Sequence, residues 1–156
     1  MLIGRTITED NAAPFRIASL AAAHIKDGTI FKSREAVGYA VTFMMLHERA
    51  GTAYMLLFDK SHRIIKIVRL KSGHGKAKTD ITAAIDREVS NTAASYFVLV
   101  HNHKNSPLVP SNEDMLLTEK LYEKYSGGKI KFSEHYIVSG LSYITLVGGK
   151  RQKSYM

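Results

Sequence analysis

Apolar residues recur three or four positions apart in four segments of the chain, which is the spacing of one face of an α-helix. Two of these segments follow a serine, Ser33 or Ser111, that can cap a helix N-terminus, and both carry acidic residues in their first turn. The apolar series from Val37 to Met45 ends near Ala50-Gly51, where glycine favours termination. We therefore predict helices at residues 15–26, 34–48, 80–93 and 112–125.

Shorter segments have the apolar content and length of β-strands. Tyr96 to Val100 is a continuous apolar run, typical of a strand that is buried on both faces. Residues 59–62 suit a hairpin between two such segments, the second of which is interleaved with basic residues. The predicted strands are residues 53–58, 63–70, 96–100, 130–138 and 142–147, with a short strand at Ile30-Phe31. Together they predict a mixed α/β (α+β) domain with a central sheet of five or six strands flanked by helices.

The composition narrows the class of protein. The chain has 156 residues, of which 45% are hydrophobic and 23% charged, and it has no cysteine. This length suits one domain with its own core, and the absence of cysteine excludes disulfides, thiolate zinc sites and a cysteine nucleophile. No apolar stretch approaches the roughly 20 residues of a membrane helix, and the N-terminus has no secretory pattern. We therefore expect a soluble cytoplasmic protein that does not contact a membrane.

The net charge of +8 is unevenly distributed. Segment 60–78 is rich in lysine and arginine, and the basic C-terminal tail, residues 149–156, adds Lys150, Arg151 and Lys153. The positive electrostatic potential of these residues can attract nucleic acid or an acidic partner. A solubilising surface is the simpler interpretation of a basic run, so nucleic acid is only a candidate partner. The sequence does not indicate an oligomeric state.

His101, His103 and Asp114 have the spacing of a metal site. His101 follows the predicted buried strand, and residues i and i+2 of an extended segment point the same way. Asp114 lies in the first turn of the next predicted helix, and a loop with Pro107 and Pro110 can fold it back. Two imidazoles and a carboxylate leave one position of a tetrahedral zinc ion open to water, as in catalytic sites. The pattern therefore predicts a zinc-dependent hydrolase, because zinc also makes water more acidic.

Three further interpretations concern the same segment. Ser111 can be a helix cap, a donor to a developing oxyanion, or both. The tripeptide His101-Asn102-His103 also suggests an HNH nuclease, but the residues of that motif are dispersed over a ββα-metal unit, so we reject this interpretation. An inactive relative of an enzyme is disfavoured because every ligand type is present.

The segment from His101 to Asp114 resembles the JAB/MPN (JAMM) metalloproteases, in which His-x-His, seven residues, Ser, two residues and Asp follow one another. The fuller pattern His-Asn-His-x7-Ser-x-Glu-Asp, with Thr118 after it, resembles the RadC branch. Leu46 to Ile65 and Gly75 to Val89 also resemble RadC segments, and Glu134 to Val138 is similar to the family's Asp-His-x-Ile-Val. The resemblance covers about residues 30–147.

This resemblance implies a JAB/MPN (cytidine-deaminase-like) fold for residues 30–148. Residues 1–29 would then be an N-terminal extension that packs on the domain. Long RadC proteins carry a helix-hairpin-helix DNA-binding region before this domain, and residues 1–30 are too few for one, so we expect a short form. The family's DNA-repair label keeps open a nucleic-acid-associated protein whose metal site is not a peptidase.

The resemblance also implies a role for each site residue. His101, His103 and Asp114 would be the zinc ligands, Ser111 would help to hold the oxyanion, and the substrate would be a peptide or protein. The family's general base is a glutamate at the end of the first main helix, and Glu48 fits that place. Glu35 and Glu88 are rivals, since two or three more residues than expected separate Glu48 from the aspartate after its strand.

Some positions depart from the family or lie outside its metal motif. Lys104-Asn105-Ser106 replaces the usual Pro-Ser-Gly of RadC sequences, and Lys104 would place a cation beside the site. His135 is expected to pack within a strand or behind the metal ligands without binding the metal. The remaining histidines are expected at the surface: His24, His47, His62 and His74.

Overall fold

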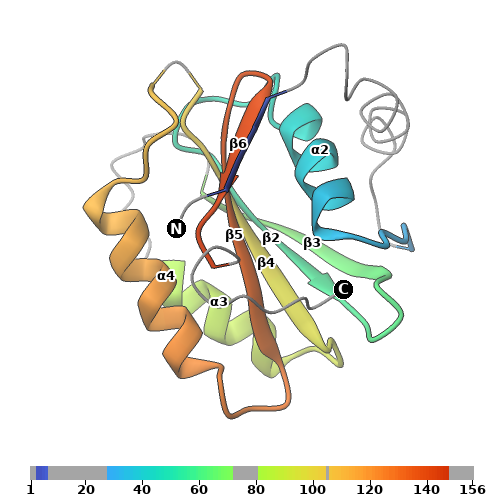
Figure 1. Cartoon of the computed structure of the whole chain (residues 1–156). Coiled ribbons are helices and arrows are strands. Elements are labelled where there is room, and N and C mark those ends of the chain that lie inside the picture. Colours follow the sequence, from blue (N-terminus) through green and yellow to red (C-terminus); the bar gives the residue numbers. More distant parts are fainter. Residues whose placement is uncertain (1–2, 7–27, 72–80, 105, 148–156) are drawn as a thin grey trace.

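The computed structural model describes residues 3–6, 28–71, 81–104 and 106–147, which contain one six-stranded sheet (Figure 1). The strands run in the order β1-β6-β5-β4-β2-β3 across the sheet. Strands β4 and β5 are parallel, whereas the other neighbouring pairs are antiparallel, so the predicted mixed sheet is confirmed. The strands are β1 (Ile3–Thr6), β2 (Ala53–Phe58), β3 (Ile64–Lys71), β4 (Tyr96–Asn102), β5 (Lys131–Ser139) and β6 (Ser142–Thr145).

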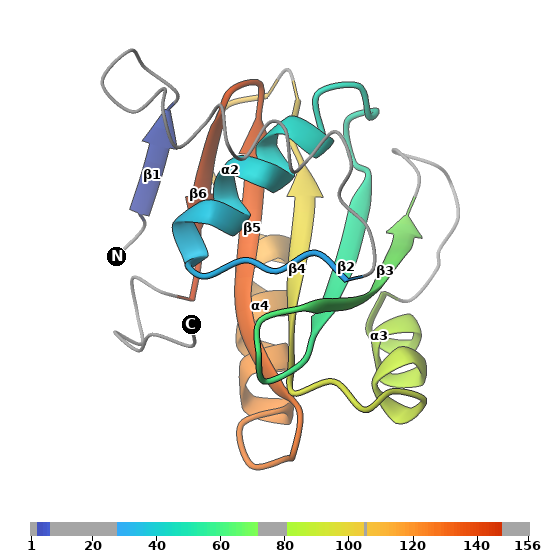
Figure 2. The same ribbon diagram turned by 90° about the vertical axis from the view of Figure 1, so that its right-hand side faces the viewer.

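Helices cover both faces of this sheet. Figure 2 shows α2 (Arg34–Met44) in front of the strands and α4 (Asn112–Lys124) behind them, and α3 (Ile81–Ser90) packs on the same face as α4. Alternate residues of the central strands point to opposite faces. Val98 joins the core beneath α2, whereas Leu99 joins the core beneath α3 and α4. The apolar run in β4 is therefore a strand buried on both faces, as predicted.

Helix α2 is shorter than the sequence pattern predicts. Ser33 caps its N-terminus as expected, but the helix ends at Met44, and turns lead to Gly51, which has a φ of 85°. The prediction of a helix to residue 48 is therefore wrong at its C-terminal end. The helix also approaches β6 closely, because a Cβ at Gly38 would lie 2.6 Å from the Tyr143 hydroxyl oxygen. This approach requires glycine at position 38.

The other predicted elements agree with the structure to within a few residues at their ends. The short strand predicted at Ile30 is a single bridge to Arg63. Strand β1 is not predicted by the sequence pattern, yet it pairs antiparallel with β6. Within the described part of the chain, no helix is long and apolar enough to cross a membrane. Two predicted segments fall outside the described residues, the helix at 15–26 and the basic tail at 149–156.

Candidate metal centre

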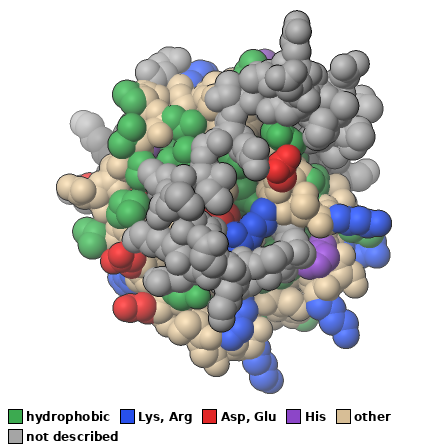
Figure 3. Space-filling model, viewed as in Figure 1, with side chains coloured by type: hydrophobic (Ala, Val, Ile, Leu, Met, Phe, Trp, Pro, Cys, Tyr) green, Lys and Arg blue, Asp and Glu red, His purple; other side chains and the backbone are tan. Residues whose placement is uncertain are grey.

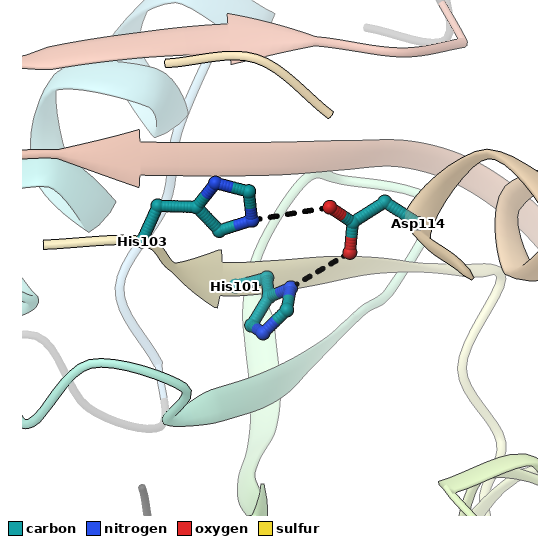
Figure 4. Close-up of side chains that lie close together, drawn as sticks. All are labelled: His101, His103 and Asp114. Carbon is teal, nitrogen blue, oxygen red and sulfur yellow. Dashed lines mark hydrogen bonds and ion pairs between the residues drawn. The ribbon is translucent and has the colours of Figure 1, made fainter. Parts of the chain in front are cut away.

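Strand β4 and helix α4 bring His101, His103 and Asp114 together (Figure 4). Nδ1 of His101 lies 2.9 Å from Oδ1 of Asp114, and Nε2 of His103 lies 3.1 Å from Oδ2. One nitrogen or oxygen from each residue lies within 4.8 Å of the others. Extended backbone points both imidazoles the same way, and the capped start of α4 presents the carboxylate to them. The three predicted ligands thus form one cluster that can hold a metal ion.

Electrostatics keep the carboxylate of this cluster ionised. Asp114 is only 3% exposed, and burial alone would raise its pKa. Hydrogen bonds from His101, His103 and the Ser111 backbone amide outweigh that effect, so the pKa lies well below its usual range. The pKa of His103 is raised, chiefly by its hydrogen bond to Asp114, although burial opposes the shift. An ionised carboxylate is the form that binds metal.

Ser111 is the N-cap of α4. Its Oγ accepts a hydrogen bond from the Asp114 amide at 3.0 Å, and the Ser111 amide donates to the Asp114 carboxylate at 2.9 Å. This reciprocal capping box confirms the predicted cap. The hydroxyl hydrogen is not used in that bond. Because Ser111 also lines the cavity beside the histidines, its hydroxyl can serve a ligand there.

Asn102, between the two histidines, has a structural role. Its side chain is buried, and Nδ2 donates to the carbonyl oxygens of Met45, Glu48 and Arg49 at 3.2–3.3 Å. Its Oδ1 accepts from the Lys104 amide at 3.1 Å. The amide group therefore fixes the turn after α2 against the end of β4. These hydrogen bonds give Asn102 a structural reason to stand between His101 and His103, so the tripeptide needs no nuclease motif to account for it.

A cavity of about 370 Å³, here called the outer cavity, opens beside the cluster. His101, His103 and Ser111 contribute to its wall, together with Lys71 at the end of β3 and Glu113 in the first turn of α4. Both histidines of the cluster therefore border a space large enough for part of a substrate.

A family model described as the RadC-like JAB domain matches residues 31–152. The chain belongs to the RadC-like JAB domain family. A UPF0758 protein of Coprothermobacter proteolyticus is 27% identical over 129 residues, which cover 81% of this chain and 55% of the relative. A UPF0758 protein of Haemophilus influenzae (strain 86-028NP) is 29% identical over 70% of this chain and 49% of its own length. A UPF0758 protein of Geotalea uraniireducens is 33% identical over 59% of this chain and 40% of its own length. The chain thus spans about half the length of these relatives.

Glu48, the general base that the RadC resemblance implies, is not part of the cluster. Its carboxylate accepts hydrogen bonds from the Tyr54 hydroxyl at 2.9 Å and from Arg69 Nη2 at 2.9 and 3.1 Å. Tyr54 packs on the α2 side of the sheet, whereas its neighbour Ala53 pairs directly with His101 and packs on the other side. The structure therefore places the Glu48 carboxylate with Tyr54 and Arg69, on the opposite face from His101.

The two rival glutamates also have other partners. Glu88 forms an ion pair with Lys66 at 2.7 Å, and Glu35 accepts a hydrogen bond from Tyr39 at 3.2 Å. Among the described residues, the carboxylate that lines the outer cavity beside the histidines is Glu113. Its position next to Asp114 in the sequence is the only signal that could have indicated it.

Lys104, the cation in the segment that replaces the usual Pro-Ser-Gly of RadC sequences, points away from the outer cavity. Lys104 has a positive φ of 42°, and its Nζ donates to the Glu48 carbonyl oxygen at 3.1 Å. Asn105 lies outside the described residues. The cation that lines the cavity is Lys71, which pairs across the sheet with Ala53, the partner of His101. Sequence reasoning missed Lys71 because the register of β3 on β2 cannot be read from the pattern.

The remaining histidines differ in their surroundings. His135 is fully buried in β5, and its ring lies 6.4 Å from that of His101, as expected for a histidine behind the ligands. His47 is exposed, and His62 is partly exposed, with its ring nitrogen Nδ1 2.9 Å from the Tyr96 hydroxyl oxygen. His24 and His74 lie outside the described residues.

Proposed function

We propose that this chain is a zinc-dependent hydrolase of the metallopeptidase type, with a peptide or protein as its substrate. The observation that carries the proposal is the convergence of His101, His103 and Asp114, with both histidines in the wall of the outer cavity. Two imidazoles and one ionised carboxylate are the donor set of many catalytic zinc sites, which keep a further position for water or substrate. The residues therefore fit zinc in both type and charge.

The residues around the ligands have separate roles in this proposal. Zinc would supply a Lewis acid that polarises a carbonyl group and makes water more acidic. Ser111 accepts the Asp114 amide hydrogen, so its own hydroxyl hydrogen can be donated to an oxyanion in the outer cavity. The hydrogen bonds between Asp114 and both histidines hold the three side chains close together before a metal binds.

Two carboxylates compete for the role of general base. Glu48 is the residue that the family resemblance implies, and it would have to separate from Arg69 to reach the cluster. Glu113 already lines the outer cavity beside His101 and His103. A base must lie within hydrogen-bond reach of the proton that it takes, directly or through one water. We retain Glu48 as the first candidate and Glu113 as the structural alternative.

Metal content provides the first test. Protein purified without a metal-affinity tag should contain about one zinc per chain. His103→Ala should lose the metal, whereas His47→Ala, the control at an exposed histidine, should retain it. A zinc content that does not change in His103→Ala, or that remains near zero after dialysis against zinc, contradicts the proposal.

Hydrolysis of a peptide library by the zinc-loaded protein provides the second test. Glu48→Gln and Glu113→Gln should both retain zinc, and the one that replaces the base should lower kcat by roughly 100-fold or more. The other variant is the matched control. Hydrolysis that is equally fast in Asp114→Asn would show that the activity does not depend on this site.

The alternative, a nucleic-acid-associated protein, has less support. Three cations of segment 60–78 are paired with acids: Arg63 with Asp59 at 3.7 Å, Lys66 with Glu88 at 2.7 Å and Arg69 with Glu48 at 2.9 Å. Figure 3 shows the lysine and arginine side chains of one face as separate spots. A role in DNA repair rests on the family label alone.

A further inference from the structure

A second, smaller cavity of about 100 Å³, here called the inner cavity, adjoins the outer cavity. Lys71, His101 and Glu113 line both cavities and therefore mark the boundary between them. Four aliphatic side chains form much of the remaining wall: Ala53, Ile81, Leu99 and Leu117. Asp114 and His135 complete it. A group in the inner cavity would thus lie directly beside the proposed metal ligands.

The inner cavity exists because a small residue, Ala53, lies between two cross-strand neighbours in the sheet. Lys71 of β3, Ala53 of β2 and His101 of β4 are direct cross-strand neighbours. Ala53 is 2% exposed and has only a methyl group between two long side chains. A larger residue at position 53 would occupy the space between Lys71 and His101.

His135 contributes an acceptor without a partner to this wall. Thr118 Oγ1 donates its hydrogen to the Asp114 carbonyl oxygen at 2.7 Å, so it must accept from His135 Nδ1, which also lies 2.7 Å away. This contact assigns the hydrogen of the neutral ring to Nδ1 and leaves a lone pair on Nε2. The Nε2 atom is buried, and no residue of the described chain donates to it. A buried acceptor without a donor is costly.

A doubly protonated ring would not satisfy this position, because its Nε2 hydrogen would be buried with no acceptor among the described residues. A hydrogen-bond donor from another molecule satisfies the lone pair of the neutral ring.

We propose that the inner cavity is a specificity site for a short aliphatic group that ends in a hydroxyl, with the hydroxyl donating to His135 Nε2. This inference rests on the proposed function, in which the group is a threonine or serine side chain beside the scissile bond. The inner cavity is much smaller than the outer cavity, at about 100 Å³ against about 370 Å³, so it suits a short side chain. The aliphatic wall favours the methyl group of threonine.

The inference can be tested without metal or hydrolysis. The zinc-free chain, residues 1–156, labelled with ¹⁵N-histidine should show the Nδ1-protonated form of His135 by NMR. Titration with 2-propanol, which donates a hydrogen bond, should move the His135 Nε2 resonance upfield in a saturable way. Acetone has a similar size but only accepts, so it should leave the resonance in place. No saturable shift, as expected if water alone occupies the cavity, or equal shifts with both probes, would overturn the inference.

A variant in which a larger side chain fills the inner cavity provides the matched control. Ala53→Val should abolish the response to 2-propanol while the Nδ1-protonated form of His135 persists. Leu117→Phe fills the same space from α4 and replaces Ala53→Val if that variant does not fold. An unchanged response in a folded variant would place the alcohol elsewhere and contradict the inference.

Peptide hydrolysis then links the site to the proposed function. A substrate with threonine beside the scissile bond should have a kcat/KM roughly 5- to 100-fold higher than the matched valine substrate, because valine leaves Nε2 without a donor. Ala53→Val should remove this preference. Equal values for the two substrates in the parent protein would contradict the inference, whereas absence of hydrolysis contradicts only the proposed function, since the NMR result stands by itself.

Discussion

Asp114 and His103 stabilise each other in the metal-free protein, with opposite dependence on pH. The pKa of Asp114 is lowered, so its contribution is complete above its ordinary value and is lost as the pH falls through the lowered pKa. The pKa of His103 is raised, so its contribution is complete below 6.5 and is lost as the pH rises through the raised pKa. We therefore expect the free energy of unfolding of the metal-free protein to decrease as the pH rises above 6.5.

Urea unfolding in the presence of a chelator measures this decrease. Saturating zinc should reverse the trend, because the metal requires deprotonated His103 and binds more tightly as the pH rises. His103→Gln is the control, and in the chelator it should lose most of the pH dependence in this range. A dependence as steep in His103→Gln as in the parent protein would assign the effect to another group.

At the scale of single residues, the sequence predicts that His101, His103 and Asp114 lie together, but it does not predict the contacts of Glu48. His101 and His103 follow from strand alternation, and Asp114 follows from its place in a capped first turn, which are both local rules. The partners of Glu48 are Tyr54 on β2 and Arg69 on β3. Irregular pairing of β2 with β3 at two places decides which side chains meet, and no local rule predicts it.

At the scale of elements, the capped start of α4 links stability to the site. Ser111 and Ser33 make the same contact, since each Oγ accepts an amide hydrogen at 3.0 Å at the start of its helix. We expect Ser111→Ala to lower the free energy of unfolding by about 1 kcal/mol and also to lower kcat, because the oxyanion donor is lost.

Ser33→Ala is the matched control for the loss of a cap. It should cost about 1 kcal/mol of stability as well, while kcat remains unchanged. Chemical unfolding and peptide hydrolysis measure the two effects separately. If both variants retain full kcat, Ser111 is a cap only, and the oxyanion role assigned to it is wrong.

The elements themselves are predicted where the local pattern is strong. Helices α2 and α4 begin where their serine caps predict, and β4 begins at the first residue of its apolar run. The end of α2 is not predicted, because Asn102, far away in sequence, binds the carbonyl groups of the turn that follows the helix. Strand β1 depends on pairing with β6 and has little pattern of its own.

At the scale of the whole molecule, the site lies at the carboxyl ends of the two parallel strands. His101 is near the end of β4, and the amide of His103 donates to the carbonyl oxygen of Val138, near the end of β5, at 2.7 Å. Open sheets of this kind bind ligands beyond the carboxyl ends of parallel strands. Helix α4, which connects β4 to β5, returns Asp114 to the same edge. A mixed sheet is predicted by the sequence, whereas the strand order that creates this edge requires long-range contacts.

Charge distribution over the whole molecule distinguishes the two classes of function. The net charge of +8 should give some salt-sensitive attraction to DNA. However, Lys66 is paired with Glu88 and Arg69 with Glu48, so neither should release counterions from phosphate.

We expect the double variant Lys66→Ala/Arg69→Ala to leave the slope of log K against log salt nearly unchanged in a DNA-binding titration. Lys60→Ala/Lys129→Ala is a control for lost charge. A slope reduced by about two in the first variant alone would show that both cations contact phosphate, which would favour the nucleic-acid-associated alternative.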